Sequence, residues 1–327
     1  IEEAGIHSGD SSCTLPPITL GPDIIAKVKD ATEKIARGTG VRGLINIQFA
    51  YVSENLYVIE ANPRASRTVP FVSKATGVQM AKAAVLIGLG KSIAELKAEG
   101  YLPSNMDGAS LPEETAIAVK AAVLPFARFR TPEGVVVDSL LSPEMRSTGE
   151  VMGLDKHYDT AFAKAQAGAG SPLPTSGKVF ISVANHDKRN VIIYAKMLES
   201  LGFEIVSTGG TAEILRRNGL NSVIVASKFA EANGDHSIVD MVRNGDIDLI
   251  LNTPAGGAAR SDGYEIRAAA VSVGCPVMTT ISEFAAAVQA INALREHSWD
   301  IMSLQEHGVQ LLSLYTSSSP RDRTRSR

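Results

Sequence analysis

KVFISVA (178–184), FEIVS (203–207) and IDLILN (247–252) are three apolar runs that decide the fold of the second half of the chain. Each has the length of a buried strand, and two similar runs lie at 222–226 and 276–279. Helical segments are predicted after the strands, at residues 187–200, 210–218, 238–244, 260–273 and 282–297. This alternation is typical of a doubly wound parallel sheet, so we expect a five-stranded α/β domain.

A candidate phosphate site lies where the second predicted strand ends. Thr208-Gly209-Gly210-Thr211 begins a helix there, and it offers free backbone N–H groups and two hydroxyls at a positive helix end. A ligand-free strand-to-helix turn is an equally good interpretation of the glycine pair by itself. Lys188 and Asn252 follow other strands of the same sheet, and this convergence favours a ligand site.

The first half of the chain contains a predicted antiparallel hairpin. GLINIQFA (43–50) and LYVIEAN (56–62) read as strands around a polar turn, Ser53-Glu54-Asn55. This pairing places Gln48 opposite Glu60 and Asn46 opposite Asn62, with all four side chains on one face. Alternation alone would favour an ordinary solvated face.

The same hairpin face could also hold a divalent metal. Gln48, Glu60 and Asn62 present carboxylate and amide oxygens, which Mg²⁺ and Mn²⁺ prefer when they bridge nucleotide phosphates. Arg64 and Arg67 follow directly, and guanidinium groups hold phosphoryl groups by paired hydrogen bonds. The pattern therefore raises the hypothesis of a phosphoryl-transfer site.

The remaining segments are assigned more coarsely. Residues 74–99 have a helical pattern with apolar Val78, Ala81, Val85 and Leu89, and Gly100 closes a second, Ala-rich helix. Further elements are predicted as strands at 116–125 and 134–141, a helix ending at Gln166, and a linker at 168–177.

Composition narrows the class of protein. The 327 residues are 44% hydrophobic and 20% charged, which excludes a wholly disordered chain, and the net charge of −3 offers no basic surplus for nucleic acid. No run approaches the ~18 apolar residues of a membrane span. Cys13 and Cys275 lie outside any CxxC spacing, which fits a reducing cytoplasm. Because the first residue is Ile1, we expect a fragment of a longer protein.

Three stretches carry a resemblance to a known family. They are NIQFAYVSENLYVIEANPRASRTVPFVSKATG (46–77), IEEAGIHSGDSS (1–12) and PEMRSTGEVMG (143–153). Together they resemble the large subunit of carbamoyl-phosphate synthase, in its second ATP-grasp unit, which phosphorylates carbamate. With the later domain, the similarity extends to about residue 310.

The resemblance implies roles for the residues of the first half. Gln48, Glu60 and Asn62 match the ligands of Mg²⁺ or Mn²⁺, and Arg64 and Arg67 match catalytic arginines of phosphoryl transfer. The residues matched to ATP binding are Gly5, Ile6, His7, Ser8, Gln48 and Glu60. For His7 a structural or solvated role is the alternative, and we expect it to hydrogen-bond the nucleotide without acid–base chemistry.

The second half resembles the methylglyoxal-synthase-like regulatory domain of the same subunit, which binds UMP or IMP as an allosteric effector. The matched effector contacts are Ser182, Lys188, Thr208, Thr211, Lys228 and Asn252. Pro254 stands where some members have a threonine, and Ala121 where some have a glutamate for ornithine. The resemblance therefore leaves one effector contact and activation by ornithine open.

Three segments are expected. Residues 1–168 would be the C-terminal part of an ATP-grasp domain, an α+β fold with an antiparallel sheet; residues 169–316 the regulatory domain; and residues 317–327 a disordered tail. The implied protein is a cytoplasmic ATP-dependent ligase that makes carbamoyl phosphate for pyrimidine and arginine synthesis. Its implied partner is a small glutamine amidotransferase subunit, and the parent protein is expected to be oligomeric, without nucleic acid or membrane partners.

Two alternatives belong to other functional classes. A methylglyoxal synthase proper, a lyase, has no place for the motifs before residue 154. An isolated nucleotide-binding regulatory module without catalytic activity stays open, since the family's glycine-rich phosphate loop and ATP-binding lysine are expected before Ile1. We therefore expect the fragment alone to be inactive.

Overall fold

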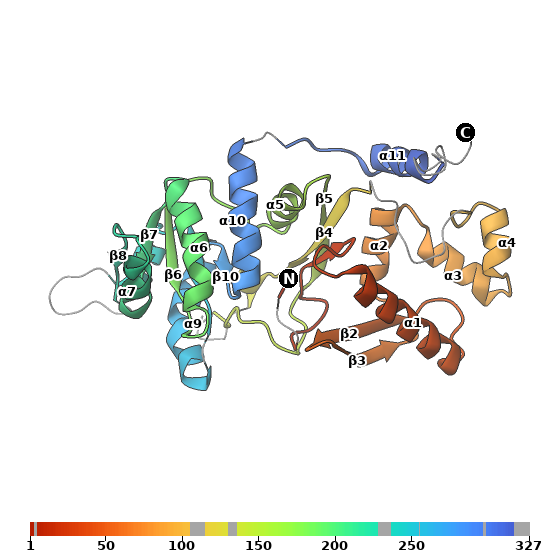
Figure 1. Cartoon of the computed structure of the whole chain (residues 1–327), viewed down its shortest axis with the longest axis horizontal. Helices are drawn as coiled ribbons and strands as arrows, with labels where there is room; N and C mark the ends of the chain where they lie inside the picture. Colours follow the sequence, from red (N-terminus) through yellow and green to blue (C-terminus); the bar gives the residue numbers. More distant parts are fainter. Residues whose placement is uncertain are drawn as a thin grey trace. The chain divides into compact units, whose positions relative to one another are not determined.

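The computed structural model describes residues 1–2, 5–104, 115–129, 136–227, 237–254, 256–296 and 299–316 (Figure 1). The described residues fall into two compact units. The first unit contains Ile1–Cys13 and Val119–Trp299, and the second contains Thr14–Ala118 and Asp300–Arg327. No helix among the described residues is both long and apolar enough to cross a membrane.

The first unit is built around the predicted five-stranded parallel sheet. Its strands are β6 (Lys178–Ser182), β7 (Glu204–Ser207), β8 (Ile224–Val225), β9 (Leu249–Asn252) and β10 (Val277–Met278). Their order is β10-β9-β6-β7-β8, and every neighbouring pair is parallel. β7 and β8 lie on one side of β6, and β9 and β10 lie on its other side. The direction in which strands are added therefore reverses between β6 and β9. The doubly wound prediction is confirmed.

Helices follow the strands as predicted. They are α6 (Lys188–Ser200), α7 (Gly209–Arg217), α8 (Ile238–Arg243), α9 (Gly256–Val273) and α10 (Ile281–Glu296). α6 contacts α7 and α10, while α8 contacts α9. Successive residues of a strand point to opposite faces of the sheet. Because these strands are apolar at nearly every position, both faces are apolar and can be covered by helices.

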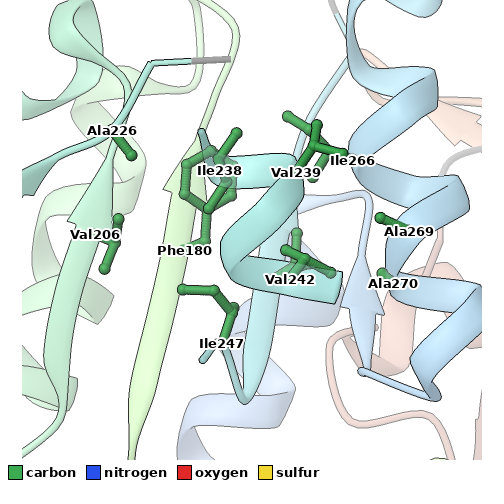
Figure 2. Packing of buried hydrophobic residues seen from close by; sticks show 11 residues of the cluster. Phe180, Val206, Ala226, Ile238, Val239, Val242, Ile247, Ile266, Ala269 and Ala270 are labelled. Atoms are coloured by element: carbon green, nitrogen blue, oxygen red, sulfur yellow. The ribbon is translucent and has the colours of Figure 1, made fainter. Parts of the chain in front are cut away.

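Figure 2 shows the core on the face of the sheet covered by α8 and α9. Phe180 of β6 and Val206 of β7 are fully buried against Ile238 and Val242 of α8. On the other side of α8 lie Ile266, Ala269 and Ala270 of α9. The small alanine side chains let the two helices approach closely, and burial of this apolar surface stabilises the unit.

The segment before the linker belongs to the same compact unit. β5 (Gly149–Asp155) is followed by α5 (Tyr158–Gly168), which packs against β5 and α10. A three-stranded sheet has the order β1-β4-β5, where β1 is Cys13–Leu15 and β4 is Ile117–Val123. A short 3₁₀ turn, η1 (Phe126–Arg128), follows β4. The boundary between residues 168 and 169 stays a prediction.

The strand predicted at 134–141 does not form in its described part. Residues 137–141 are irregular, and residues 134 and 135 lie outside the described residues. Leu140 N donates to the Asp138 carboxylate at 3.2 Å, and the Tyr264 hydroxyl donates to Val136 O at 2.6 Å. Side chains therefore hydrogen-bond backbone N–H and C=O groups that would have paired with a neighbouring strand.

The second unit contains the predicted hairpin and a series of short helices. Its elements are α1 (Pro22–Thr39), β2 (Asn46–Val52), β3 (Asn55–Asn62), α2 (Thr68–Thr76), α3 (Met80–Gly88), α4 (Ile93–Ala98) and α11 (Leu304–Thr316). α1 has no counterpart among the predicted elements. Its sequence carries the signals, however: Pro22 at the first turn with Asp23, and Gly40 with a φ of 65° after the last turn.

The helices predicted within 74–99 form, but the predicted apolar stripe is wrong, because Ala81, Val85 and Leu89 are exposed. Gly77 and Gly90 adopt φ of 72° and 102°, which no helix can contain, so the segment divides into separate helices. Val85 and Leu89 are 63% and 78% exposed. The buried apolar side chains of α2, α3 and α4 are Phe71, Ala75, Ala83 and Leu96.

Candidate functional site

β2 and β3 confirm the predicted facing pairs. Asn46 pairs with Asn62 and Gln48 with Glu60 in the antiparallel ladder. The turn differs from the prediction, because only Ser53 and Glu54 form the tip, both with positive φ. A two-residue turn would place the partner of Gln48 one position earlier.

A β-bulge corrects the register. Phe49 pairs with Val58 while Gln48 pairs with Glu60, so Ile59 is the extra residue between the two pairs. The side chains of Gln48 and Glu60 therefore lie opposite each other, and Asn62 lies two residues along the same strand. The bulge thus preserves the facing set that the sequence predicts.

The residues present on this hairpin fit a hard divalent cation in their chemistry. Glu60 is exposed, and within the described part of the chain its carboxylate has no hydrogen bond or ion pair. Gln48 and Asn62 are half-buried and contribute amide oxygens. No group of three or more His, Cys, Asp or Glu side chains among the described residues could hold a metal ion, so only an oxygen set that includes amides is available.

The two arginines lie immediately after β3. Arg64 N donates to Asn62 O at 2.8 Å, a tight turn that leads the chain away from the strand. The Arg64 side chain is exposed and donates to Ala65 O at 2.9 Å. Arg67 is half-buried at the residue before α2. Both side chains therefore follow the hairpin end that carries Glu60 and Asn62.

The predicted nucleotide segment belongs to the first unit, where it forms a tight loop that we call the His7 loop, residues 5–12. Gly5 has a φ of 107°, which a side chain rarely tolerates. Gly9 N donates to His7 Nδ1 at 3.0 Å, so in the neutral ring the proton is on Nε2. His7 can therefore present an N–H donor to a ligand, as the resemblance implies.

Charged residues that were not among the predicted site residues hold the His7 loop. Asp10 is 1% exposed, and its carboxylate accepts from Arg146 N at 2.8 Å and Ser147 N at 2.9 Å. Lys120, 2% exposed on β4, donates to Ser8 O at 3.2 Å and pairs with Glu150 at 3.4 Å. A single lysine inside the apolar run AIAVKAAV was the available sequence signal.

Lys120 also affects a neighbouring thiol. Burial raises the pKa of Cys13, while the positive charge of Lys120 acts in the opposite direction. Both Cys13 and Cys275 are free thiols. Burial likewise raises the pKa of Cys275 to about 12, so neither has the character of a reactive thiolate.

A second constellation forms at the carboxyl edge of the parallel sheet. The hydroxyls of Ser182 and Thr208 are 3.2 Å apart, and Val183 N donates to Thr211 Oγ1 at 3.4 Å. A Cβ placed on Gly210 would be 3.4 Å from Lys188 Nζ, which puts that ammonium beside the first turn of α7. Hydroxyls, a helix N-terminus and a lysine thus meet at one edge, as a phosphate site requires.

β9 completes this edge beside β6, where the strand order reverses. Asn252 Nδ2 lies 3.4 Å from Ser182 O, and Thr253 N donates to Ser182 O at 3.2 Å. Thr253, which was not predicted, also accepts from Ala184 N at 2.8 Å. The sixth predicted effector residue, Lys228, lies outside the described residues. The structure brings together the other five predicted effector residues, which are Ser182, Lys188, Thr208, Thr211 and Asn252.

Comparisons with known proteins agree with this arrangement. A family model described as "Carbamoyl-phosphate synthase L chain, ATP binding domain" matches residues 2–96, and one described as "MGS-like domain" matches residues 190–279. The carbamoyl phosphate synthase large chain of Kocuria rhizophila is 68% identical over 98% of this chain. The chain belongs to the carbamoyl phosphate synthase large chain family.

Two further large chains of this family show the same extent of similarity. Those of Micrococcus luteus and Streptomyces coelicolor are 66% and 57% identical over 95% and 96% of this chain. The chain spans 28–29% of the length of these curated relatives. The two family models match the segment that contains the antiparallel hairpin and the segment that contains most of the parallel sheet, in the order that the sequence predicted.

Proposed function

We propose that this chain is part of the large subunit of a glutamine-dependent carbamoyl-phosphate synthase, and that it contributes to the ATP-dependent phosphorylation of carbamate. The identity of 57–68% with large chains, over at least 95% of the chain, carries the proposal. The complete protein would be a cytoplasmic ligase serving pyrimidine and arginine synthesis, would work with a small amidotransferase subunit, and would be oligomeric.

The hairpin supplies the metal ligands in this proposal. Gln48, Glu60 and Asn62 would hold Mg²⁺ or Mn²⁺, which stabilises the negative charge on the nucleotide phosphates during phosphoryl transfer. Arg64 and Arg67 orient the transferred group by hydrogen bonds to its oxygens. Support comes from the observed Gln48–Glu60 pairing and from the position of both arginines after β3.

The His7 loop contributes to ATP binding. Gly5, Ile6, His7 and Ser8 line the nucleotide in this proposal, and His7 donates a hydrogen bond from Nε2. Because phosphoryl transfer depends on positioning and on charge stabilisation, no proton transfer is assigned to His7. Lys120 donates to Ser8 O, and Asp10 within the loop accepts from Arg146 N and Ser147 N, so these bonds hold the loop in place.

The parallel domain is a regulatory nucleotide site in this proposal, within residues 169–316. Ser182, Lys188, Thr208, Thr211 and Asn252 bind the phosphate and ribose of UMP or IMP, together with Lys228. The convergence of five of these residues at the sheet edge supports the site. The same convergence would serve a nucleotide-binding module without catalytic activity, which is the second candidate function.

One assay separates the two functions. The full-length large chain, combined with a glutamine amidotransferase subunit, is expected to form carbamoyl phosphate from ATP, bicarbonate and glutamine when Mg²⁺ is present. The 327-residue chain alone is expected to form none, because it spans under a third of its relatives' length. Nucleotide binding without any synthesis by the full-length protein would favour the module and overturn the synthase.

A further inference from the structure

Arg267 of α9 is fully buried and belongs to none of the predicted site sets. Its Nε and Nη2 donate to the two carboxylate oxygens of Asp138, each at 2.7 Å. Its Nη1 donates to Asn252 Oδ1, also at 2.7 Å. A buried guanidinium with these bonds has one orientation, since it is planar and its donors form a fixed fork.

The bond to Asn252 determines which way that amide faces. Because Oδ1 accepts from Arg267, the NH₂ group of Asn252 points to the other side, toward Ser182 O at 3.4 Å. One N–H of Asn252 points at Ser182 O, and its other N–H is a donor at the edge of the sheet where the effector residues converge. A donor is the group that an anionic or carbonyl-bearing ligand needs there.

The bonds to Asp138 connect the same guanidinium to residues 136–147, which we call the tether. Near its start, the Tyr264 hydroxyl of α9 binds Val136 O at 2.6 Å. Near its end, Ser142 O accepts from His7 N at 2.9 Å. Arg146 N and Ser147 N donate to Asp10, as described above. A continuous series of contacts within the first unit therefore runs from Asn252 to the His7 loop.

The tether is not completely satisfied in this arrangement. Ser139 Oγ and Arg146 Nε are buried and have no hydrogen-bond partner among the described residues. Buried polar atoms are normally paired, so an arrangement that leaves two of them unpaired competes poorly with one that pairs them. This is the property needed in a segment that changes its arrangement when a ligand binds.

We propose that Arg267 is a positioning residue that orients Asn252 at the nucleotide-monophosphate site and transmits occupancy of that site through Asp138 and the tether to the His7 loop. The inference rests on the regulatory function proposed above and names the residues that carry it. It requires that nucleotide binding and ATP binding share a coupling free energy, which acts equally in both directions.

The first variant is Asp138→Asn in the full-length large chain with its small subunit. It keeps the size of the side chain and leaves the Arg267–Asn252 bond, but it removes the charge that holds the tether. UMP and IMP are expected to bind, by calorimetry, within about threefold of the wild-type affinity. The factor by which either nucleotide changes the apparent ATP affinity is expected to fall from the ~5-fold or more of ordinary coupling to less than twofold.

The second variant tests the Asn252 half of the proposal. Gly263 lies against the Arg267–Asn252 bond, and an added Cβ would overlap Arg267 Nη1 and Asn252 Oδ1. Gly263→Ala leaves the charges and favours the helix, while its Cβ displaces the bond between the two buried side chains. UMP and IMP are expected to bind about tenfold more weakly, whereas ATP affinity without nucleotide is unchanged.

Lys164→Met is the matched control, because it removes an ion pair with Asp155 at 2.8 Å elsewhere in the same unit. It is expected to retain both nucleotide affinity and the ATP response. If the wild type responds to nucleotide and Asp138→Asn responds equally, the inference about Arg267 fails while the regulatory function stands. If the wild type binds neither UMP nor IMP, both fail together.

Should Asp138→Asn be poorly folded, Arg267→Lys replaces it. An ammonium can pair with Asp138 but cannot also reach Asn252 with a second donor arm in the same plane. This variant is expected to bind nucleotide more weakly and to lose most of the ATP response. A wild-type response from a folded Arg267→Lys protein would overturn the inference.

Discussion

Glu60 carries the only formal negative charge among the three proposed metal ligands. In the full-length synthase we expect Glu60→Gln to lower carbamoyl-phosphate formation by on the order of 100-fold, since metal-ion charge stabilisation is central to phosphoryl transfer. The steady-state rate with Mg²⁺ measures this. Glu54→Gln, the same change at the exposed tip of the same hairpin, is the control and should leave the rate unchanged. Equal rates for the two variants would remove Glu60 from the ligand set.

Glu283 supports a prediction about pH. Burial, reinforced by the negative charge of Glu2, raises the pKa of Glu283 from 4.5 to about 8. At a pH between 4.5 and about 8, the Glu283 carboxyl is ionised in the unfolded chain and protonated in the folded chain. The free energy of unfolding therefore falls as the pH rises through this range. Its carboxyl also accepts from Thr279 N at 3.2 Å, ahead of α10.

We therefore expect Glu283→Gln to stabilise the folded chain by on the order of 1–3 kcal/mol at pH 7. A glutamine oxygen can still accept from Thr279 N, and it carries no charge at any pH. At pH 4 the variant and the wild type should have the same melting temperature. Calorimetric melting across this range tests the prediction, and a gain that does not depend on pH would contradict it.

At the scale of elements, the hairpin turn between β2 and β3 contains two residue types that disfavour the backbone conformation it needs. Ser53 and Glu54 adopt φ of 49° and 65°, a conformation that Asn-Gly prefers. We expect the double variant Ser53→Asn, Glu54→Gly to raise the unfolding free energy by about 1 kcal/mol. Chemical denaturation of the 327-residue chain measures it. Ser53→Val should have the opposite sign, and a stabilised valine variant would show that the turn is of another type.

The hairpin also shows what sequence patterns can and cannot determine about an element. Alternation predicted that Gln48 faces Glu60, and the structure confirms it. The same alternation predicted a three-residue tip, whereas the chain uses a two-residue tip and places the extra residue, Ile59, in a bulge. A three-residue tip without a bulge and a two-residue tip with a one-residue bulge both place Gln48 opposite Glu60. Counting residues along the sequence therefore cannot distinguish the two arrangements.

At the scale of the whole molecule, nucleotide binding should stabilise the domain that carries the sheet edge. UMP at ~100 times its dissociation constant adds about 2.7 kcal/mol to the unfolding free energy. At ~2–4 °C per kcal/mol this is a shift of roughly 5–10 °C in its melting transition. Differential scanning calorimetry of the 327-residue chain with UMP, IMP or inorganic phosphate measures the shift.

Lys188→Ala should remove most of this shift, because it deletes the cation beside the first turn of α7. Thr211→Val should weaken it by removing one hydroxyl. Lys196→Ala, an exposed lysine on the same helix α6, is the matched control and should keep the full shift. Equal shifts for the two lysine variants would contradict the assignment of Lys188.

Local patterns determined much of this protein by themselves. The length and apolarity of five runs predicted the parallel sheet, because a strand buried on both faces needs apolar side chains at nearly every position. Strand ends also predicted where Lys188, Thr208, Thr211 and Asn252 would meet, since parallel strands share one carboxyl edge, and the family resemblance added Ser182. These features depend on neighbours in the sequence and on one general rule of topology.

Only the tertiary structure decided the rest. Arg267 and Asp10 look like solvated positions in a sequence, and Lys120 interrupts an apolar run, yet each is buried against partners distant in the chain. The strand predicted at 134–141 gave way to side-chain contacts from α9, and the predicted apolar stripe is exposed at Ala81, Val85 and Leu89. Burial of a charge depends on where its counter-charge lies in space, and periodicity along the chain contains no information about that distance.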